Sequence, residues 1–519
     1  MSETTVQTEW TVGVGARPAS ETGEPENKGK GRPRLKPVDR KQVMLLAVDA
    51  ERLIGDDHPA RAIWELTGRV DWSGFYCSIQ AVEGVAGREA WDPRLLGSLW
   101  IYAYSRGIGS AREVARRCSY DPGFQWLTGL AEVNYHTLAD FRVGYGSKLD
   151  ELFTQVLGLL SAEGLITLER VMHDGTKIKA SAGADSFRRE ERLRTHLEAA
   201  RKQVAEMGDP NAEEPARNRA ARQRAQRDRV QRLELALAEL DKLQQVKVGT
   251  EKKQQARVSE TDPEARVMKQ GSGGYAPSYN VQLSTDAAHG LIVGAGVSQS
   301  SSDYGELVGS VKRVGQNMGR LPQQMVADGG FTSRENVIAM ADSGVDYIGS
   351  MDVTHEAQMA AQMRRRGVKE EFYRDAFKYD AERDVYICPG DLLRHDGQEK
   401  KTEVISHRYR ATACGTCQSK AQCCPESKRC RTITRAVESP AVDAFIAKMQ
   451  TDAAKAIYRL RGTVAEFPNA WIKAKLGLRQ FHVRGQAKAM MEVLWACLTY
   501  DIQQWMRLQW LPQLKTVEA

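Results

Sequence analysis

The chain has 519 residues, of which 41% are hydrophobic and 27% are charged, so it is neither a wholly disordered nor a collagen-like protein. It carries 74 Lys and Arg against 67 Asp and Glu, and this net charge of +7 permits nucleic acid as a partner without requiring one. No apolar run approaches the roughly 18 residues of a membrane-spanning helix, and no secretory signal is visible at the N-terminus. We therefore expect a cytoplasmic protein with no membrane partner.

Residues 1–37 are rich in Ser, Thr, Gly and Pro and cannot bury enough apolar surface to fold alone, which predicts a disordered tail. The tail ends in five cations within the nine residues 28–36, grouped around a Gly-Arg-Pro sequence. This patch resembles an AT-hook, in which arginines such as Arg32 and Arg34 enter the narrow minor groove of A·T-rich DNA. A solubilising linker would have the same composition.

Apolar residues recur at helical spacing through residues 38–164, as in the stretch from Leu95 to Tyr104, which predicts an all-α domain. Within this region, short basic helices are separated by turns that contain Pro and Gly. A helix-turn-helix needs such a pattern, because one helix enters the major groove while its neighbour contacts phosphate, so Arg112 and Arg116 are candidate DNA-binding residues. Three packed helices with no role in DNA binding would show the same pattern.

From residue 165 to residue 353, the predicted elements alternate between strands and helices. Apolar and β-branched runs predict a strand that leads to Asp174, a hairpin over 279–297, and strands at 324–327 and 345–349. Helices are expected between these strands, and the spacing of Thr332 and Glu335 predicts a capping box at the start of one of them. The order strand, hairpin, helix, strand, helix, strand predicts an α/β core.

Residues 186–257 interrupt this core with a long segment that is rich in Arg, Glu, Gln and Ala and almost free of aromatic residues. The segment has 18 Lys and Arg against 12 Asp and Glu, so +6 of the net charge of +7 lies here. It predicts a projecting helical hairpin, broken near Gly208 and Pro210, whose surface can meet DNA phosphates; a solvated face is the alternative. Its arginines are predicted to wrap around the second helix, at Arg217, Arg219, Arg222, Arg224, Arg227 and Arg229.

A second insertion, residues 354–438, is basic and contains six of the nine cysteines. A Cys-x-x-Cys motif with outlying thiolates is typical of tetrahedral zinc, which would stabilise a segment with few large apolar residues. The predicted zinc ligands are Cys388, Cys414, Cys417 and one of Cys423 or Cys424. Reduced cysteines without metal are the alternative. Helical periodicity returns from residue 439 and continues into the C-terminal segment 439–519.

Three carboxylates form the candidate catalytic site. Asp174 and Asp328 each follow an apolar strand and precede Gly, so they would share one edge of a sheet if the two strands were neighbours. Two such groups repel each other unless a cation lies between them. Glu466 in the late helical segment would be the third carboxylate. Oxygen ligands of this kind suit Mg²⁺, and two metal ions can promote in-line displacement at phosphorus. Asp-Gly is a common turn, so each Asp alone is weak evidence.

Taken together, these motifs resemble the DDE transposases of bacterial insertion sequences, in the subgroup with an InsH-like N-terminal domain. The resemblance covers about residues 38–510 in order. It rests on an N-terminal hallmark within residues 92–142, on Asp174-Gly-Thr-Lys-Ile-Lys-Ala180, on Ala327-Asp328-Gly-Gly-Phe331, and on a Tyr/Arg/Glu/Lys signature formed by Tyr458, Arg461, Glu466 and Lys473. Four residues separate Arg461 from Glu466, one more than in the best-known form of the signature.

The resemblance implies a ribonuclease H-like mixed-sheet core, with an all-α N-terminal domain and the two insertions described above. It also implies that Asp174, Asp328 and Glu466 hold two Mg²⁺ ions. Water would nick the ends of the element, and the released 3′-OH would attack target DNA without a covalent protein intermediate. Tyr458, Arg461 and Lys473 would contact DNA, the last two from the helix that carries Glu466. The expected partners are double-stranded DNA and a second copy of the chain in a homodimer, at the nucleoid.

Two other functions would use some of the same residues or motifs. A tyrosine recombinase using Tyr458 would need a catalytic Arg and a His-x-x-Arg motif upstream of it, but the nearest candidate, His482-Val-Arg484, lies downstream with the wrong spacing. A transposase-derived protein that binds DNA but no longer cuts it is the main alternative.

Overall fold

The computed structural model describes residues 47–82, 84, 89–206, 216–247, 249–351, 354–388, 392–401, 404–411, 414–427, 430–437 and 439–517. Contacts divide the chain into two units, Met1–Val48 and Asp49–Ala519. Arg32 and Arg34, in the predicted AT-hook, lie outside the described residues, as does the predicted break near Gly208.

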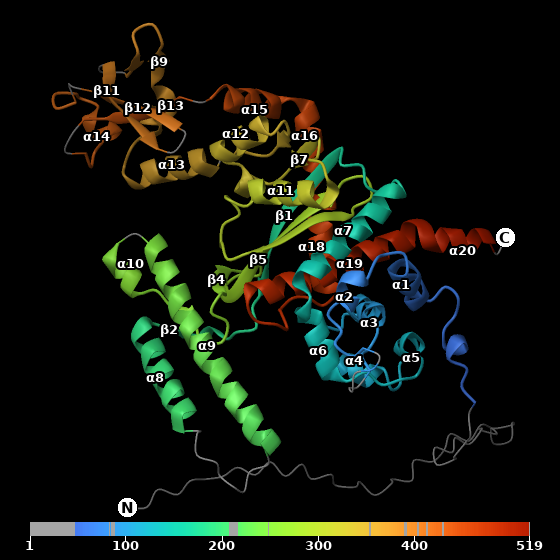
Figure 1. The fold of residues 1–519 in the computed structure, drawn as a ribbon. Helices are drawn as coiled ribbons and strands as arrows, with labels where there is room; N and C mark the ends of the chain where they lie inside the picture. The colour runs from blue at the N-terminus through green and yellow to red at the C-terminus, as the bar shows by residue number, and fades with distance from the viewer. Residues whose placement is uncertain are drawn as a thin grey trace, which may run out of the picture. The chain divides into compact units, whose positions relative to one another are not determined.

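The N-terminal part of the second unit is built from helices (Figure 1). Polar N-caps start several of them, including Asp92, Ser110, Asp121 and Asn134, whose side chains accept main-chain N–H groups. The apolar stretch predicted around Leu99 is buried from Leu96 to Tyr104, and Leu95 is half-buried. The elements are η1 (Ala50–Leu53), α1 (Pro59–Thr67), α2 (Ser73–Tyr76), α3 (Pro93–Ser105), α4 (Ala111–Arg117), α5 (Pro122–Thr128), α6 (Tyr135–Gly144) and α7 (Gly146–Ala162).

A mixed sheet forms the centre of the chain and confirms the predicted α/β class. Its strand order is β6–β5–β1–β7–β8, with β4 pairing along the same edge of β5 as β6. Strand β1 is antiparallel to β5 and parallel to β7, and β7 is parallel to β8. The strands are β1 (Arg170–Lys179), β4 (Arg266–Lys269), β5 (Tyr275–Asp286), β6 (Ile292–Ser298), β7 (Gln324–Val326) and β8 (Asp346–Ile348).

Two local predictions for this core were wrong. Asp174 lies in the middle of β1, whose pairing with β5 continues to Lys179, rather than at the end of a strand. The helix after β7 is capped by Ser333, whose Oγ accepts the N–H of Asn336, so the predicted box at Thr332 begins one residue too early. The predicted β5–β6 hairpin is confirmed, and Gly290 in its turn has the positive φ of +73° that favours glycine.

Helices pack on the sheet and complete the core. α11 and α19 contact β6, α18 contacts β1, and α12, α15 and α16 contact β8. The C-terminal helix α19 is buried along most of its length and also contacts α3, α6 and α7. These helices are α11 (Leu307–Met318), η3 (Gly329–Phe331), α12 (Arg334–Asp342), α15 (Pro440–Gln450), α16 (Asp452–Arg459), α17 (Arg461–Val464), α18 (Glu466–Ala474), α19 (Gln486–Trp505), η6 (Met506–Trp510) and α20 (Leu511–Val517).

A buried polar network joins α19 to the N-terminal helices. Glu492 of α19 is fully buried and accepts hydrogen bonds from Tyr104 Oη at 3.2 Å and from the main-chain N–H of His482 at 3.0 Å. The guanidinium of Arg142 lies 3.7 Å from the same carboxylate and donates to the carbonyl of Gly109 at 2.5 Å. A buried carboxylate needs such partners, so the N-terminal helices and the core are packed as neighbours.

The basic insertion forms a helical hairpin on two short strands. α8 packs against α9 around a small apolar core that includes Leu193, Leu197, Leu233 and Leu240. Glu239 of α9, 3% exposed, forms ion pairs with Lys242 and with Arg266 of β4. The elements are η2 (Ala184–Ser186), β2 (Phe187–Arg188), α8 (Glu190–Glu206), α9 (Ala216–Val246), α10 (Thr250–Gln254) and β3 (Val258–Ser259).

The cysteine-bearing insertion forms a second, antiparallel sheet with its own apolar core. Its strand order is β13–β12–β11–β10–β9. Phe372, Phe377, Tyr386 and Tyr409 contribute to the core, which is larger than the composition of the segment suggested. The elements are α13 (Thr354–Arg365), η4 (Glu370–Phe372), η5 (Arg374–Ala376), β9 (Lys378–Asp380), β10 (Val385–Ile387), β11 (Leu392–Lys401), β12 (Val404–Ala411), α14 (Lys420–Cys423) and β13 (Thr432–Val437).

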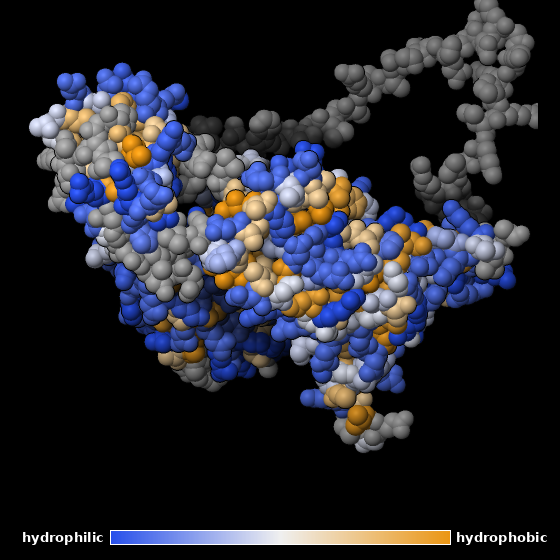
Figure 2. All heavy atoms as spheres, turned by 90° about the horizontal axis from the view of Figure 1, so that it is seen from above, coloured by the Kyte–Doolittle hydropathy of each residue, from blue (hydrophilic) through white to orange (hydrophobic). Residues whose placement is uncertain are grey.

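The molecular surface in Figure 2 is mainly hydrophilic, with smaller apolar patches between charged side chains. In the part of the chain that the structure describes, no helix has both the length and the apolar character needed to cross a lipid bilayer.

Candidate active site

The pairing of β1 with β7 brings the two predicted aspartates to one end of the sheet. The parallel register ends with the pair of Met172 and Val326; Asp174 lies two residues further along β1, and Asp328 lies two residues beyond the end of β7. The two aspartates therefore stand at corresponding positions just past the last pair of β1 and β7. Asp328 also accepts the N–H of Gly330 at 2.8 Å and so caps the short helix η3.

The environment of Asp174 favours its protonated form. Burial raises the pKa of Asp174 to about 6, and the charge of Asp328 adds to this rise. Arg461, the main-chain N–H of Gly175 and the side chain of Asn469 act in the opposite direction and lower the pKa. The two aspartates thus repel each other, and a positive charge nearby stabilises the ionised pair.

Arg461 supplies a positive charge between Asp174 and Glu466. Its guanidinium lies 3.8 Å from Asp174 Oδ1 and donates to Glu466 Oε1 at 3.2 Å. Arg461 and Asp174 are each 17% exposed, whereas the Glu466 side chain is 57% exposed. The expectation that Arg461 and Glu466 share one helix was wrong, because a turn at Ala465 separates α17 from α18.

One face of α18 is fixed against β1 by polar contacts. Asn469 Nδ2 donates to Asp174 Oδ2 at 3.0 Å, and Lys473 Nζ donates to Thr176 Oγ1. Asp174 and Thr176 are two residues apart and therefore point to the same side of the strand. Glu466, Asn469 and Lys473 recur at helical spacing, so the same face of α18 carries all three. Burial lowers the pKa of Lys473, while the charge of Asp174 partly opposes this effect.

The three carboxylates share one neighbourhood without forming a closed metal cage. Among the described residues, no three His, Cys, Asp or Glu side chains converge closely enough to hold a metal ion. Arg461 contacts two of the predicted ligands, and the third, Asp328, acts on the pKa of Asp174. The guanidinium therefore provides the charge compensation that a cation would otherwise provide.

Tyr458, in α16, lies on the edge of this neighbourhood. Its ring centre is 6.0 Å from the Arg461 guanidinium. Tyr458 also lines a pocket of about 310 Å³ at the end of β8, whose other walls include Ser350, Met449, Lys455 and Arg459. The close approach of Gly329 to Ser350 connects this pocket to the loop that follows Asp328, because a Cβ on Gly329 would lie 3.0 Å from the Ser350 carbonyl oxygen.

The predicted DNA-binding arginines of the N-terminal helices are held in contacts within the chain. Arg116 of α4 is 66% exposed and forms an ion pair with Glu113 at 2.7 Å. The guanidinium of Arg112 lies 5.1 Å from the ring centre of Tyr135. Arg116 remains largely accessible, so its role in DNA binding stays a prediction.

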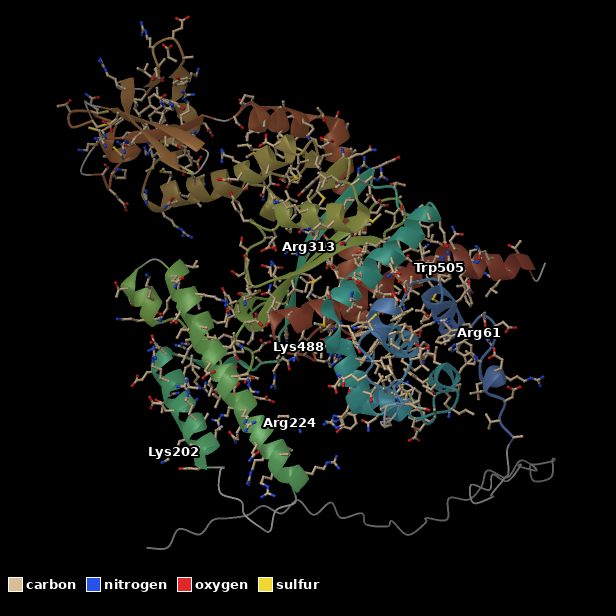
Figure 3. All side chains as sticks on the ribbon, viewed as in Figure 1. Arg61, Lys202, Arg224, Arg313, Lys488 and Trp505 are labelled. Carbon is tan, nitrogen blue, oxygen red and sulfur yellow. The ribbon has the colours of Figure 1, made fainter. Side chains whose placement is uncertain are left out.

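The arginines of α9 lie mainly outside the apolar core of the hairpin. Core contacts in α9 begin at Val230, whereas Arg217, Arg224 and Arg227 precede it and are exposed. Figure 3 shows Arg224 on α9 and Lys202 on α8. The predicted concentration of positive charge therefore falls on the half of α9 that does not build the core.

The predicted zinc ligands do not converge on one point in the described residues. Cys423 belongs to the core of the insertion, and Cys388, Cys414 and Cys430 pack against it. Burial raises the pKa of Cys414 to about 11, and the neighbouring Cys430 and Cys424 add to the rise. Cys430, which is not among the predicted zinc ligands, therefore lies close enough to Cys414 to affect its pKa.

Sequence reasoning missed Asn469 and the ion pair between Lys177 and Asp303 on the other side of β1. Lys177 Nζ lies 3.1 Å from Asp303 Oδ1, which also accepts hydrogen bonds from Asn280 and Gln282. A signal for Asn469 was present, since it stands three residues after Glu466, one helical turn away. No comparable spacing connects Lys177 with Asp303.

Two family models match the chain. The model described as "Transposase DDE domain" matches residues 391–506, a segment that contains Arg461, Glu466 and Lys473. The model described as "Transposase domain (DUF772)" matches residues 48–143, which cover helices α1 to α6. Asp174 and Asp328 lie between the two matched segments.

Among solved structures, the chain is similar to one titled "Cryo-EM structure of piggyBac transposase synaptic complex with hairpin DNA (SNHP)". The identity is 9%, over 87% of this chain and 81% of the other, with a TM-score of 0.22, which is too low to support a structural argument. No curated protein matches the chain. The two family matches, in the order expected from the sequence motifs, support a DDE transposase of an insertion sequence.

Proposed function

We propose that the chain is an active transposase that binds the inverted-repeat ends of its own element, cleaves the DNA and joins the released 3′-OH to target DNA. One observation carries the proposal: Asp174 and Asp328 stand at corresponding positions just past the last paired residues of the parallel strands β1 and β7, and Arg461 connects Asp174 to Glu466. The strand order β6–β5–β1–β7–β8, with β5 antiparallel to β1, supports a ribonuclease H-like core.

The chemistry of the three carboxylates suits a hard divalent cation, although their side chains do not converge on one point in the described residues. Asp174, Asp328 and Glu466 would hold two Mg²⁺ ions, because carboxylate oxygens are the ligands that Mg²⁺ prefers. The metal would activate the attacking oxygen and stabilise the leaving oxygen. The repulsion that contributes to the raised pKa of Asp174 supports this assignment, since a bound cation relieves it.

The chain's own cations would prepare the site for DNA. Arg461 holds Asp174 and Glu466 together in the DNA-free protein, and its planar guanidinium can transfer to a DNA phosphate with two parallel hydrogen bonds. Lys473, whose Nζ donates to Thr176 Oγ1, would hold α18 against β1. It lies on the same face of α18 as Glu466. Tyr458 would contact the DNA from the adjoining pocket.

Other parts of the chain would bind DNA away from the cleavage point. The exposed arginines of α9 would contact phosphates, and Arg112 and Arg116 of α4 would contact DNA from the N-terminal helices. Arg32 and Arg34 would add minor-groove contacts. Two copies of the chain would hold the two ends of the element as a homodimer. Zinc bound by the cysteines of the second insertion, including Cys414 and Cys417, would stabilise that insertion.

Cleavage of linear DNA carrying the ends of the element tests the catalytic proposal. With Mg²⁺, the full-length protein should release the ends, and Asp328→Asn should abolish product while leaving DNA binding in place. Asp346→Asn is the matched control, because Asp346 starts β8 at the opposite end of the same sheet. This variant should cleave DNA like the wild type.

The same experiment separates the main alternative. If the wild type binds the ends but yields no product, the chain is a DNA-binding protein derived from a transposase. Equal product from the wild type and from Asp328→Asn would exclude the proposed carboxylate site.

A further inference from the structure

Asn469 occupies an unusual place beside the candidate site. It lies on α18 one turn after Glu466 and is 6% exposed. Both hydrogens of its amide are used, because Nδ2 donates to Asp174 Oδ2 at 3.0 Å and to the carbonyl of Ala465 at 3.3 Å. The side chain therefore cannot rotate without breaking its bond to a predicted metal ligand.

The oxygen of the same amide has no hydrogen-bond partner among the described residues, although it is buried. Oδ1 and Nδ2 share one carbon atom, so Oδ1 is separated by a single carbon from the nitrogen that contacts the Asp174 carboxylate. A buried acceptor without a partner is costly, and native proteins keep one mainly where a water, an ion or a ligand satisfies it.

An asparagine amide suits this position better than other side chains of similar size do. A leucine would neither hold Asp174 nor offer an oxygen, and an aspartate would add a further negative charge next to Asp174 and Asp328. An amide donates to the carboxylate through nitrogen and offers a neutral, hard oxygen, which magnesium and calcium sites accept as a ligand.

We propose that Asn469 is a fourth cation-binding residue of the site: Nδ2 positions Asp174, and Oδ1 is a neutral oxygen ligand of the divalent cation held by the carboxylates. This inference rests on the proposed function, because the carboxylates must bind a cation for Oδ1 to join it. It adds a ligand that increases the coordination number without increasing the negative charge of the site.

Binding of Mn²⁺ to the full-length, DNA-free protein tests the inference, with free Mn²⁺ measured by electron paramagnetic resonance. Asn469→Leu should weaken Mn²⁺ binding about 10- to 100-fold, the usual effect of removing a residue that supports a metal site. Asn469→Asp should bind Mn²⁺ within a few-fold of the wild type, because it keeps an oxygen in place. Asn336→Leu is the control: Asn336 is 5% exposed, sits on α12 and donates to the carbonyls of Tyr304 and Phe331, so its loss should lower the melting temperature and leave the affinity unchanged.

Thermal unfolding gives an independent readout, including the case in which Asn469→Leu does not fold. Asn469→Asp should melt below the wild type without metal and should gain more in melting temperature from added Mn²⁺, because the cation relieves the new repulsion from Asp174. Unchanged Mn²⁺ affinity in folded Asn469→Leu, or a Mn²⁺-induced shift of Asn469→Asp no larger than that of the wild type, would overturn the inference.

Asp328→Asn separates this inference from the proposed function. If Asp328→Asn binds Mn²⁺ as tightly as the wild type, the carboxylate site itself is wrong. If Asp328→Asn loses Mn²⁺ affinity while Asn469→Leu keeps it, the carboxylate site is supported and Asn469 is not a ligand.

Discussion

The ionisation of Asp174 links the candidate site to the stability of the metal-free protein. Its pKa rises from 3.8 to about 6 on folding, mainly through burial, so the folded protein holds this proton more tightly than the unfolded chain does. The stabilising contribution is present below about pH 4 and is lost as the pH rises to about 6. Each pKa unit corresponds to about 1.4 kcal/mol, so ionised Asp174 costs up to about 3 kcal/mol at neutral pH.

Asp174→Asn should therefore stabilise the metal-free protein at pH 7.5 by about 1–3 kcal/mol, because the amide resembles the neutral carboxyl group. The gain should vanish towards pH 4, where Asp174 is protonated in the wild type. Melting temperatures of both proteins in EDTA across pH 4–8 measure this difference. A variant less stable than the wild type at pH 7.5 would show that ionised Asp174 is well compensated by Arg461.

Arg461 is predicted to act through the shape of its side chain as well as through its charge. Its fork reaches Asp174 with one nitrogen and Glu466 with the other, which the single ammonium of lysine cannot reproduce. Arg461→Lys should weaken binding of end DNA about tenfold and lower cleavage further, measured by fluorescence anisotropy and by product yield. Arg459→Lys, one helix earlier on the rim of the pocket, is the matched control and should change both by less.

At the scale of elements, periodicity predicted more than local motifs did. The α18 face that carries Glu466 and Lys473 follows from helical spacing. The two apolar strands that lead to Asp-Gly predicted a shared sheet edge only if they were neighbours, a condition that the pairing of β1 with β7 meets. The contact of Arg461 with Asp174 could not be predicted in this way, because it depends on the turn at Ala465 and on the packing of α18 against β1. The position of Asp174 within its strand depends on pairing with β5, a partner about 110 residues away.

DNA binding by the hairpin of α8 and α9 should depend strongly on ionic strength. Arg217, Arg224 and Arg227 are exposed on the half of α9 outside the core, so changing them to Gln should leave the fold intact. Each lost phosphate contact reduces the steepness of the plot of log K against log salt concentration by about 0.9. For the triple variant, the slope should therefore be shallower by up to about 2.7. Nonspecific binding to duplex DNA at 50–200 mM salt measures the slope.

A triple variant with the same loss of charge controls for net charge alone. Lys148, Lys312 and Lys515 lie on α7, α11 and α20, and their change to Gln should alter the slope by less than the α9 variant does. Equal slopes for the two variants would mean that the hairpin contributes only bulk charge.

At the scale of the whole molecule, the N-terminal segment matched by one family model and the helices from α15 onward in the segment matched by the other contribute to one hydrophobic core. Trp100 of α3 and Trp495 of α19 belong to the same buried cluster, although nearly 400 residues separate them. Glu492 adds a polar junction within this cluster, since it is 0% exposed and faces Arg142, which is 7% exposed. The N-terminal helices should therefore unfold together with the catalytic core.

The pair of Arg142 and Glu492 tests this coupling. Glu492→Gln should destabilise the protein by about 3–5 kcal/mol, because it leaves the buried Arg142 charge without its partner. Arg142→Met should cost less, because Glu492 keeps its contacts with His482 Nδ1 at 2.7 Å and with Tyr104. The double variant removes both charges, so it should be less destabilised than the sum of the singles, with a coupling free energy of about 1–3 kcal/mol. Urea unfolding followed by tryptophan fluorescence reports on both segments, through Trp100 and Trp495. Additive effects, or a first transition confined to the N-terminal helices, would show that these helices and the core are stable independently.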